Sequence, residues 1–271
     1  MLNEHFTLSN GVNIPKIGLG TWQISTEDVV DAVKAAIKIG YRHIDTAVGY
    51  GNERGVAQGI KESGVQREEI FITTKIPAET KSYESAKEVI AKSLADLDTH
   101  YADQMLIHAP LPWEEMSREG SNNYFTENIA VWKALEEGYQ DGKFKSIGVS
   151  NFIVSDLDNI LNNCTIKPHA NQISYHIGKT QKDVVDFCNK HNILIVGYSP
   201  IATGRLLNNP QIQKIADKYS VSLPQICIKF ALQQNVLPIP KSTSEDRIRQ
   251  NADMDFEISA ADMEELVNFE Q

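Results

Sequence analysis

Four ionisable side chains lie at or just beyond the ends of short apolar runs in the first half of the sequence: Asp45, Tyr50, Lys75 and His108. A free phenol has a pKa of about 10, so it is a poor proton donor at neutral pH. A nearby ammonium would lower that pKa, and a carboxylate would keep the ammonium charged and oriented. A histidine can hydrogen-bond a substrate carbonyl oxygen, where negative charge develops. The four residues together predict reduction of a carbonyl, in which hydride arrives at carbon and Tyr50 protonates oxygen.

Each of these residues also has an explanation that needs no functional site. Asp45 could cap a turn, and Lys75 could be a solvated loop charge. His108 could be a hydrogen-bonded core histidine, and Tyr50 could simply pack half-buried. The hypothesis therefore depends on a fold that brings the four together, because ionisable groups cluster at functional sites.

The sequence alternates between segments typical of strands and segments typical of helices. Apolar runs that suit buried parallel strands lie at residues 16–20, 41–45, 70–75, 104–108, 146–150, 170–174, 194–199 and 236–240. Helical periodicity lies between them at residues 27–39, 83–97, 128–140, 182–190 and 224–233. Eight such units in about 250 residues predict an α/β fold, a (β/α)8 TIM barrel that forms one domain over residues 1–271.

Further elements are predicted at the two ends of the sequence. Asn10-Gly11 between two alternating stretches predicts an N-terminal β-hairpin, and an amphipathic segment at 260–269 predicts a last helix with a short C-terminal tail. An open doubly wound sheet is the alternative, but the run from Gly18 to Gln23 lacks the third glycine of a dinucleotide-binding loop. Polar residues end seven of the eight apolar runs, so in a barrel they would converge on one mouth.

Four motifs resemble signatures of the aldo-keto reductase superfamily. They are Gly18-Leu19-Gly20-Thr21-Trp22, Asp45-Thr46-Ala47-x-x-Tyr50-Gly51-Asn52-Glu53, Gly148-Val149-Ser150-Asn151-Phe152 and Ile239-Pro240-Lys241-Ser242-Thr243. The resemblance runs from about residue 6 to residue 268, and the short length is similar to the bacterial 2,5-diketo-D-gluconate reductase-like branch. It implies an NADPH-dependent oxidoreductase that reduces aldehydes and activated ketones to alcohols.

The resemblance assigns a role to each of the four ionisable residues. It implies that Tyr50 is the general acid, that Lys75 lowers its pKa, and that Asp45 pairs with Lys75. His108 would orient the carbonyl of the substrate.

The resemblance also implies where the nicotinamide end of NADPH would bind. Ser150, Asn151 and Gln172 match the positions that hold the carboxamide. Tyr198 matches the aromatic residue that stacks on the nicotinamide ring and so fixes the face that delivers hydride. Ser199, the next residue, is predicted to belong to the same cofactor site.

The adenosine end of the cofactor is matched by Lys241, Ser242, Thr243 and Arg247 for the 2′-phosphate, and by Gln250 and Asn251 for the adenine. Two cations that flank a helix start also form an anion site on physical grounds. The alternative is a solvated surface pair of charges. NADPH is therefore expected in preference to NADH, with some use of NADH.

The predicted substrate pocket consists of Trp22, His108 and Trp113. Many members of the family have a tryptophan after this histidine, whereas Ala109 stands here, and Trp113 could refill that space or simply pack in a loop. Trp22 could instead be an aromatic plug. Tyr124 and Phe125, in a polar loop at 120–126, could form a rim. A short C-terminal tail leaves the pocket open, so we expect broad specificity for carbonyl substrates.

Composition excludes several other classes of function. The 271 residues include 26 Lys and Arg against 36 Asp and Glu, a formal net charge of −10, which argues against nucleic acid or an anionic membrane as a partner. The three cysteines, without a CxxC pair, predict neither disulfides nor a zinc site. No histidine pair has metal-ligand spacing, so no metal is expected. The cysteines and the missing signal peptide lead us to expect a cytoplasmic, bacterial protein, and no apolar run of about 18 residues predicts a membrane span. A monomer is expected because members of the resembled family are often monomers and the sequence shows no long apolar stripe.

Two other functions remain as alternatives. A regulatory module could bind NADPH with little turnover, although all four catalytic residues are present. An aldolase or lyase could use Lys75 as a Schiff-base nucleophile, which needs an ammonium of depressed pKa. Asp45 beside Lys75 would act in the opposite direction.

Overall fold

The computed structural model describes residues 1–116 and 123–269. The chain begins with an antiparallel hairpin of β1 (His5–Thr7) and β2 (Asn13–Pro15), as predicted. Gly11 occupies the turn with a φ of 85°, a left-handed conformation that glycine adopts without steric cost.

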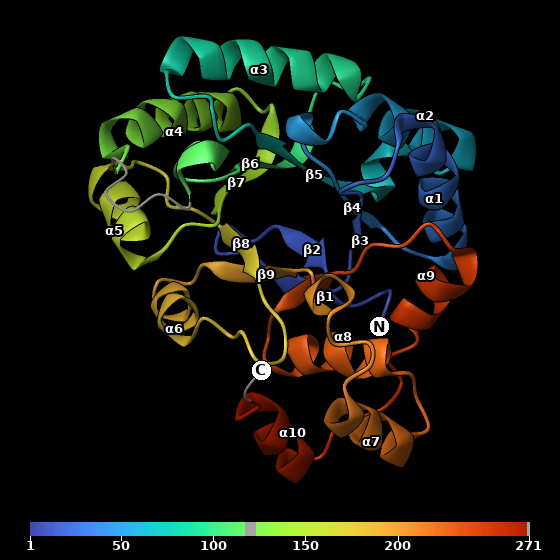
Figure 1. Cartoon of the computed structure of the whole chain (residues 1–271). Coiled ribbons are helices and arrows are strands. Elements are labelled where there is room, and N and C mark those ends of the chain that lie inside the picture. The colour runs from blue at the N-terminus through green and yellow to red at the C-terminus, as the bar shows by residue number, and fades with distance from the viewer. Residues whose placement is uncertain (117–122, 270–271) are drawn as a thin grey trace.

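Eight parallel strands follow and form a barrel in which each strand pairs with the next (Figure 1). They are β3 (Leu19–Gly20), β4 (His43–Asp45), β5 (Phe71–Ile76), β6 (Ala102–Ile107), β7 (Phe144–Ser150), β8 (Ala170–Ser174), β9 (Leu194–Tyr198) and β10 (Leu237–Ile239). The amides of Gly18 and Gly20 close the ring by donating to the carbonyls of Pro238 and Pro240, at 3.2 and 3.0 Å. A Cβ on Gly20 would lie 2.8 Å from the Ile239 carbonyl oxygen, so closure requires glycine there. The prediction of a TIM barrel is confirmed.

The helices surround the strands (Figure 1). They are α1 (Thr26–Ile39), α2 (Glu53–Ser63), α3 (Tyr83–Asp96), α4 (Phe125–Gln140), α5 (Val154–Asn163), α6 (Lys182–Lys190), α7 (Pro210–Tyr219), α8 (Leu223–Gln233), α9 (Glu245–Ala252) and α10 (Ala260–Val267). The expected loop at 120–126 ends earlier than predicted, because α4 begins at Phe125, and its residues 120–122 lie outside the described part of the chain.

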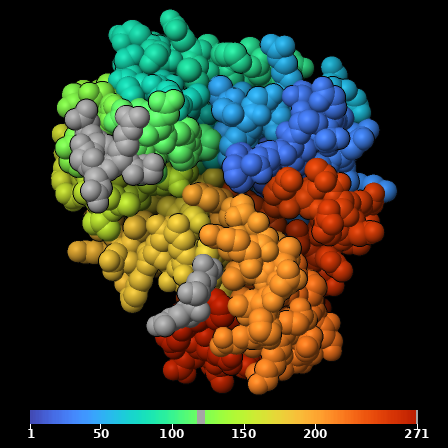
Figure 2. All heavy atoms as spheres, in the orientation of Figure 1, coloured from blue at the N-terminus to red at the C-terminus, as the bar shows by residue number. Residues whose placement is uncertain are grey.

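The last part of the chain packs against the first part and completes the ring. Helix α9 contacts α1, and the Tyr41 hydroxyl donates to the Ile248 carbonyl at 3.0 Å. Figure 2 shows the surface of this C-terminal region directly beside that of the N-terminal region. These contacts fix the position of α9 relative to α1 and to the start of β4.

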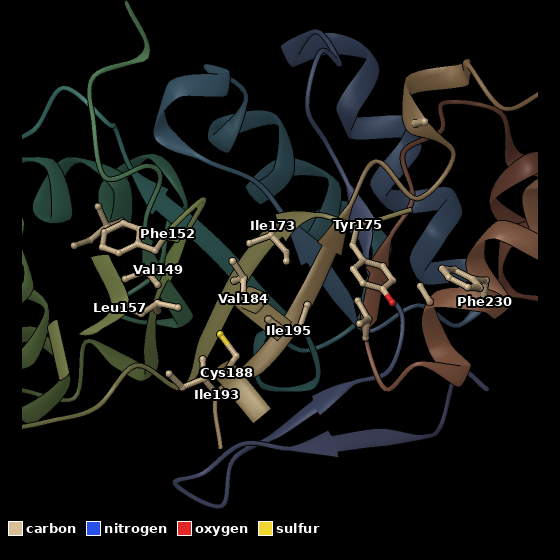
Figure 3. Close-up of a cluster of buried hydrophobic side chains, with 14 of the residues drawn as sticks. Val149, Phe152, Leu157, Ile173, Tyr175, Val184, Cys188, Ile193, Ile195 and Phe230 are labelled. Carbon is tan, nitrogen blue, oxygen red and sulfur yellow. The ribbon is translucent and has the colours of Figure 1, made fainter. Parts of the chain in front are cut away.

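The main apolar core lies between the strands and the helices. Figure 3 shows part of it, where Tyr175 and Phe230 have ring centroids 6.0 Å apart. Cys188 is buried there, and the three cysteines all have free thiols. A second cluster joins Leu8 and Ile14 of the hairpin region to barrel residues, among them Phe71 and Leu237. The hairpin therefore closes the amino end of the barrel, and the opposite end remains for a site.

Within the described residues, no helix has the length and apolar character needed to cross a membrane. The same residues contain no group of three or more His, Cys, Asp or Glu side chains placed to hold a metal ion.

Candidate active site

A buried ion pair lies at the carboxyl ends of β4 and β5. The Lys75 ammonium lies 2.7 Å from Asp45 Oδ1, and both side chains are buried. It also donates to the Thr46 carbonyl at 2.8 Å and to the Tyr50 hydroxyl at 3.3 Å. These three acceptors match the three N–H donors of the ammonium. The structure thus brings three of the four predicted catalytic residues into direct contact.

The charge of Lys75 is maintained by its neighbours. Burial acts to lower the pKa of Lys75, but the attraction of Asp45 and Tyr50 outweighs it, so the pKa lies above its ordinary value. Burial likewise raises the pKa of Tyr50, and the Lys75 ammonium offsets only part of that effect. Lys75 thus acts in the predicted direction and lowers the pKa of Tyr50, but burial raises that pKa by more, so its net position lies above the ordinary value. Desolvation of the phenolate is the larger effect, and Tyr50 retains its proton at neutral pH.

His108 follows β6 and borders the same group. Its ring centroid lies 5.5 Å from that of Tyr50 and 5.2 Å from that of Trp113, and both ring pairs meet edge to face. Burial, together with the Lys75 charge, lowers the pKa of His108 to about 3. The imidazole is consequently neutral at physiological pH, which leaves it able to donate one hydrogen bond rather than carry a charge.

A chain of polar contacts extends from the ion pair across the mouth. Gln172 Nε2 donates to Asp45 Oδ2 at 2.7 Å, and the Ser150 hydroxyl donates to the Gln172 carbonyl at 2.8 Å. Asn151 Nδ2 donates to the His108 carbonyl at 3.0 Å. The residues predicted to hold the carboxamide therefore lie in one network with Asp45 and His108.

Tyr198 extends this network to the end of β9. Its hydroxyl donates to Asn151 Oδ1 at 2.8 Å, and its side chain is half-buried. Asn151 and Ser199 both have a positive φ, of 62° and 51°, at the points where the chain leaves β7 and β9. The strand ends thus turn sharply here, and the amide side chain and the phenol face each other.

The loop after Ser199 is a feature that sequence analysis missed. Ala202, Thr203 and Gly204 all have a positive φ, between 50° and 90°. The turn is hydrogen-bonded internally, because the amides of Ala202 and Gly204 donate to the carbonyls of Ser199 and Ile201, at 2.8 and 3.0 Å. The only signal in the sequence was Gly204, since Ala202 and Thr203 ordinarily avoid the left-handed region.

The residues predicted for the 2′-phosphate lie around the start of α9. The Ser242 hydroxyl accepts from the Ser244 amide at 3.1 Å and from Arg247 Nε at 3.4 Å. Ser242 is buried, whereas Lys241, Thr243 and Arg247 are exposed. The structure brings Arg247 and Ser242 together, and it leaves the cationic groups open to solvent. Of the two residues predicted for the adenine, Asn251 is buried and Gln250 is exposed.

Large apolar side chains border the mouth. Trp22 follows β3 and Trp113 follows β6, and both are about half exposed, at 48% and 45%. Ile153 and Leu207, after β7 and β9, are exposed as well. Ala109 is fully buried, so it forms no part of the open pocket wall, and Trp113 instead covers one edge of His108.

Comparison with known proteins gives consistent matches over nearly the whole chain. The sequence profile of the Aldo/keto reductase family matches residues 16–271. Glyoxal reductase of Bacillus subtilis is 43% identical over 267 residues, which cover 98% of this chain and 92% of that protein. The 9,11-endoperoxide prostaglandin H2 reductase of Trypanosoma cruzi is 38% identical over 96% of this chain and 89% of its own length.

Solved structures agree with the sequence relatives. An aldo/keto reductase from Brucella melitensis superposes with a TM-score of 0.90 at 37% identity, covering 97% of this chain and 98% of that one. The Bombyx mori aldo-keto reductase in complex with NADP has a TM-score of 0.88 at 32% identity, covering 98% and 92%.

Proposed function

The chain belongs to the aldo/keto reductase family, and from this premise we propose that it reduces aldehydes and activated ketones to alcohols with NADPH as the reductant. The observation that carries the proposal is the contact between Lys75, Asp45 and Tyr50 beside a neutral His108 at the barrel mouth. Those groups can protonate an oxygen that gains negative charge.

The residues present fit a nicotinamide dinucleotide phosphate. Amide side chains of Asn151 and Gln172 offer donors and acceptors for a carboxamide, and half-buried Tyr198 offers a face for an aromatic ring. Arg247, exposed and in contact with Ser242, suits a phosphate monoester. When bound, the reduced cofactor supplies hydride.

Tyr50 supplies the proton in this mechanism. Burial keeps the phenol protonated before reaction, and a developing alkoxide is a much stronger base than the phenolate. After transfer, the phenolate would lie 3.3 Å from the Lys75 ammonium, in a site of low dielectric where that attraction is strong. Asp45 keeps Lys75 charged and fixed in place, since one carboxylate oxygen contacts the ammonium directly.

His108 orients the substrate. As a neutral imidazole it donates to the carbonyl oxygen without competing with Tyr50 for the proton. Trp113 and Trp22 would contact the rest of the substrate, because both border the mouth with exposed rings. Because the two tryptophans follow different strands, the pocket between them would accept substrates of varied size.

The alternative functions have less support. A Schiff-base mechanism needs a neutral amine at Lys75, but the pKa of this lysine is raised and its three donors are all engaged. A binding module without turnover would not need the contact between Tyr50 and Lys75.

Initial rates of NADPH oxidation, followed by nicotinamide absorbance, test the proposal. The panel is glyoxal, methylglyoxal, 4-nitrobenzaldehyde, glyceraldehyde and a diketo-gluconate, each run in parallel with NADH. We expect turnover with NADPH and slower turnover with NADH. Tight NADPH binding without turnover of any carbonyl would instead support the binding module.

We also propose that the chain acts as one domain and as a monomer. Of the large apolar side chains that are exposed in the described residues, Trp22, Trp113, Ile153 and Leu207 follow strands at the mouth, where substrate would cover them. Sedimentation at several concentrations would test this, and a dimer mass would contradict it.

A further inference from the structure

The segment that follows β6 carries two residues of the proposed substrate pocket. His108 begins it and Trp113 ends it, with their ring centroids 5.2 Å apart. Between them lie Ala109 and Pro110, both buried. Any shift of this short segment would move the imidazole and the indole together, so whatever holds its backbone also defines the pocket wall.

Lys81 holds that backbone. It comes from the connection between β5 and α3, and its ammonium donates to the Pro110 carbonyl at 2.9 Å and the Ala109 carbonyl at 3.4 Å. The third contact is Asn128 Oδ1 on α4, at 2.9 Å, and Asn128 Nδ2 in turn donates to the same Pro110 carbonyl. One ammonium therefore fastens the segment to two neighbouring elements.

The Lys81 ammonium is surrounded by neutral oxygen acceptors rather than by a carboxylate. Within the part of the chain that the structure describes, Lys81 takes part in no ion pair; its ammonium lies among carbonyl oxygens and 5.5 Å from the ring centroid of Tyr124. Burial lowers the pKa of Lys81 to about 8. Lys87, six residues later on α3, is the ordinary case, since it is exposed and pairs with Glu137 at 2.8 Å.

Resting on the proposed function, we propose that Lys81 is a positioning residue that fixes the segment from Ala109 to Trp113 and thereby sets how tightly the carbonyl substrate is held. Its hydrogen bonds go to none of the four predicted catalytic side chains. Its contacts are with backbone carbonyls whose hydrogen bonds would be lost or weakened without the ammonium.

Lys81→Met is the decisive variant, with Lys87→Met as the matched control because it also removes one lysine charge from this region. We expect Lys81→Met to raise KM for 4-nitrobenzaldehyde about tenfold while kcat and the Kd for NADPH change less than about twofold. Lys87→Met should match the wild type in all three. Lys81→Gln, which keeps an N–H donor, should recover part of the loss and provides a second variant if methionine prevents folding.

Hydrogen–deuterium exchange separates this proposal from the proposed function. Peptides covering residues 109–116 should exchange faster in Lys81→Met than in the wild type or Lys87→Met, whether or not the wild type reduces any carbonyl. An inactive wild type would defeat the proposed function, yet faster exchange would still support the role of Lys81 in holding the segment. Unchanged exchange in Lys81→Met overturns the proposal, as does an unchanged KM in an active enzyme.

The pH dependence of KM gives a readout that a merely structural lysine would not move. The charged groups that face Lys81 are Glu79 on its own connection, Glu127 on α4 and Asp156 on α5. As pH rises through about 8, Lys81 loses its charge, so the wild-type KM should rise toward that of Lys81→Met. The KM of Lys81→Met should stay level over the same range, and a parallel rise in both proteins would count against the proposal.

Discussion

Two buried carboxylates, each held by lysine or arginine, lie at opposite ends of the barrel. At the amino end, Asp103 accepts from Arg67 at 2.9 Å and from the Ile72 amide at 2.9 Å, and it pairs with Lys145 at 2.7 Å. Both cations also lie over the Tyr101 ring, at 4.3 and 4.7 Å from its centroid. They are partly exposed, so water shares in their solvation.

At the carboxyl end, Asp45 has similar partners but a different outcome. Its cation, Lys75, is fully buried, and the remaining donor of that ammonium points at the phenol of Tyr50. The cations of the Asp103 cluster are partly exposed and contact no group that the proposed reaction uses, whereas Lys75 contacts a phenol that can give up a proton. A buried lysine–carboxylate pair therefore takes part in proton transfer only when the lysine also contacts a proton donor, as Lys75 contacts Tyr50.

Tyr50→Phe should have the largest effect on activity. It removes the proton donor and leaves the Lys75–Asp45 pair intact, so carbonyl reduction should fall by about 10³-fold or more. The Kd for NADPH, measured by fluorescence titration, should stay close to that of the wild type. Substantial residual turnover in this variant would refute the assignment of Tyr50 as general acid.

Asp103→Ala would show the opposite pattern. It leaves the Ile72 amide and two cations without their carboxylate, so the free energy of unfolding should fall by about 3 kcal/mol, measured by urea denaturation. kcat should not change at low temperature, because Asp103 lies at the far end of the barrel. Asp103→Asn, which keeps an acceptor for the amide, should lose less stability. A loss of kcat in the folded Asp103→Ala protein would contradict the separation of the two ends.

The strands could be predicted from the sequence, but one of the helices could not. The strands were predictable because parallel strands that are buried on both faces consist of nearly continuous apolar residues. Helix α2 was missed because Gly55 and Gly59 lower its helical propensity, and both are needed by close packing. A Cβ on Gly55 would lie 2.3 Å from the Thr26 carbonyl oxygen of α1. Only the folded arrangement explains those glycines.

The site was predictable in its residues but not in its electrostatics. Asp45, Lys75 and Tyr50 could be placed together because strand ends converge in a barrel. The direction of the Tyr50 pKa could not, since burial of the phenol outweighs the nearby charge and burial is a property of the packed site. The role of Lys81 was hidden for the same reason, because its partners are backbone carbonyls from another loop.

Arg247→Met tests a third group of cations, which lies around the start of α9. Among the ion pairs of the described residues, none involves Lys241 or Arg247, and both side chains are exposed, so both cations are open to a phosphate group. We expect KM for NADPH to rise about tenfold and KM for NADH to change less than about twofold. Arg249→Met is the matched control, because Arg249 lies on the same helix but pairs with Glu245. Equal losses with both cofactors would argue against a 2′-phosphate contact.

The pH profile of the single-turnover reduction rate should show the smallest effect of all. The pKa of His108 is lowered to about 3, so the imidazole is neutral at all higher pH values, and the raised pKa of Tyr50 keeps its proton until strongly alkaline pH. Neither group titrates in between, so the rate should vary less than about twofold from pH 6 to about pH 9. A loss below a midpoint near about 6.5 would mean that His108 titrates as an ordinary histidine. A loss toward pH 9 would mean that Lys75 outweighs burial and lowers the pKa of Tyr50, and the carboxyl end of the barrel would then be wetter than its packing indicates.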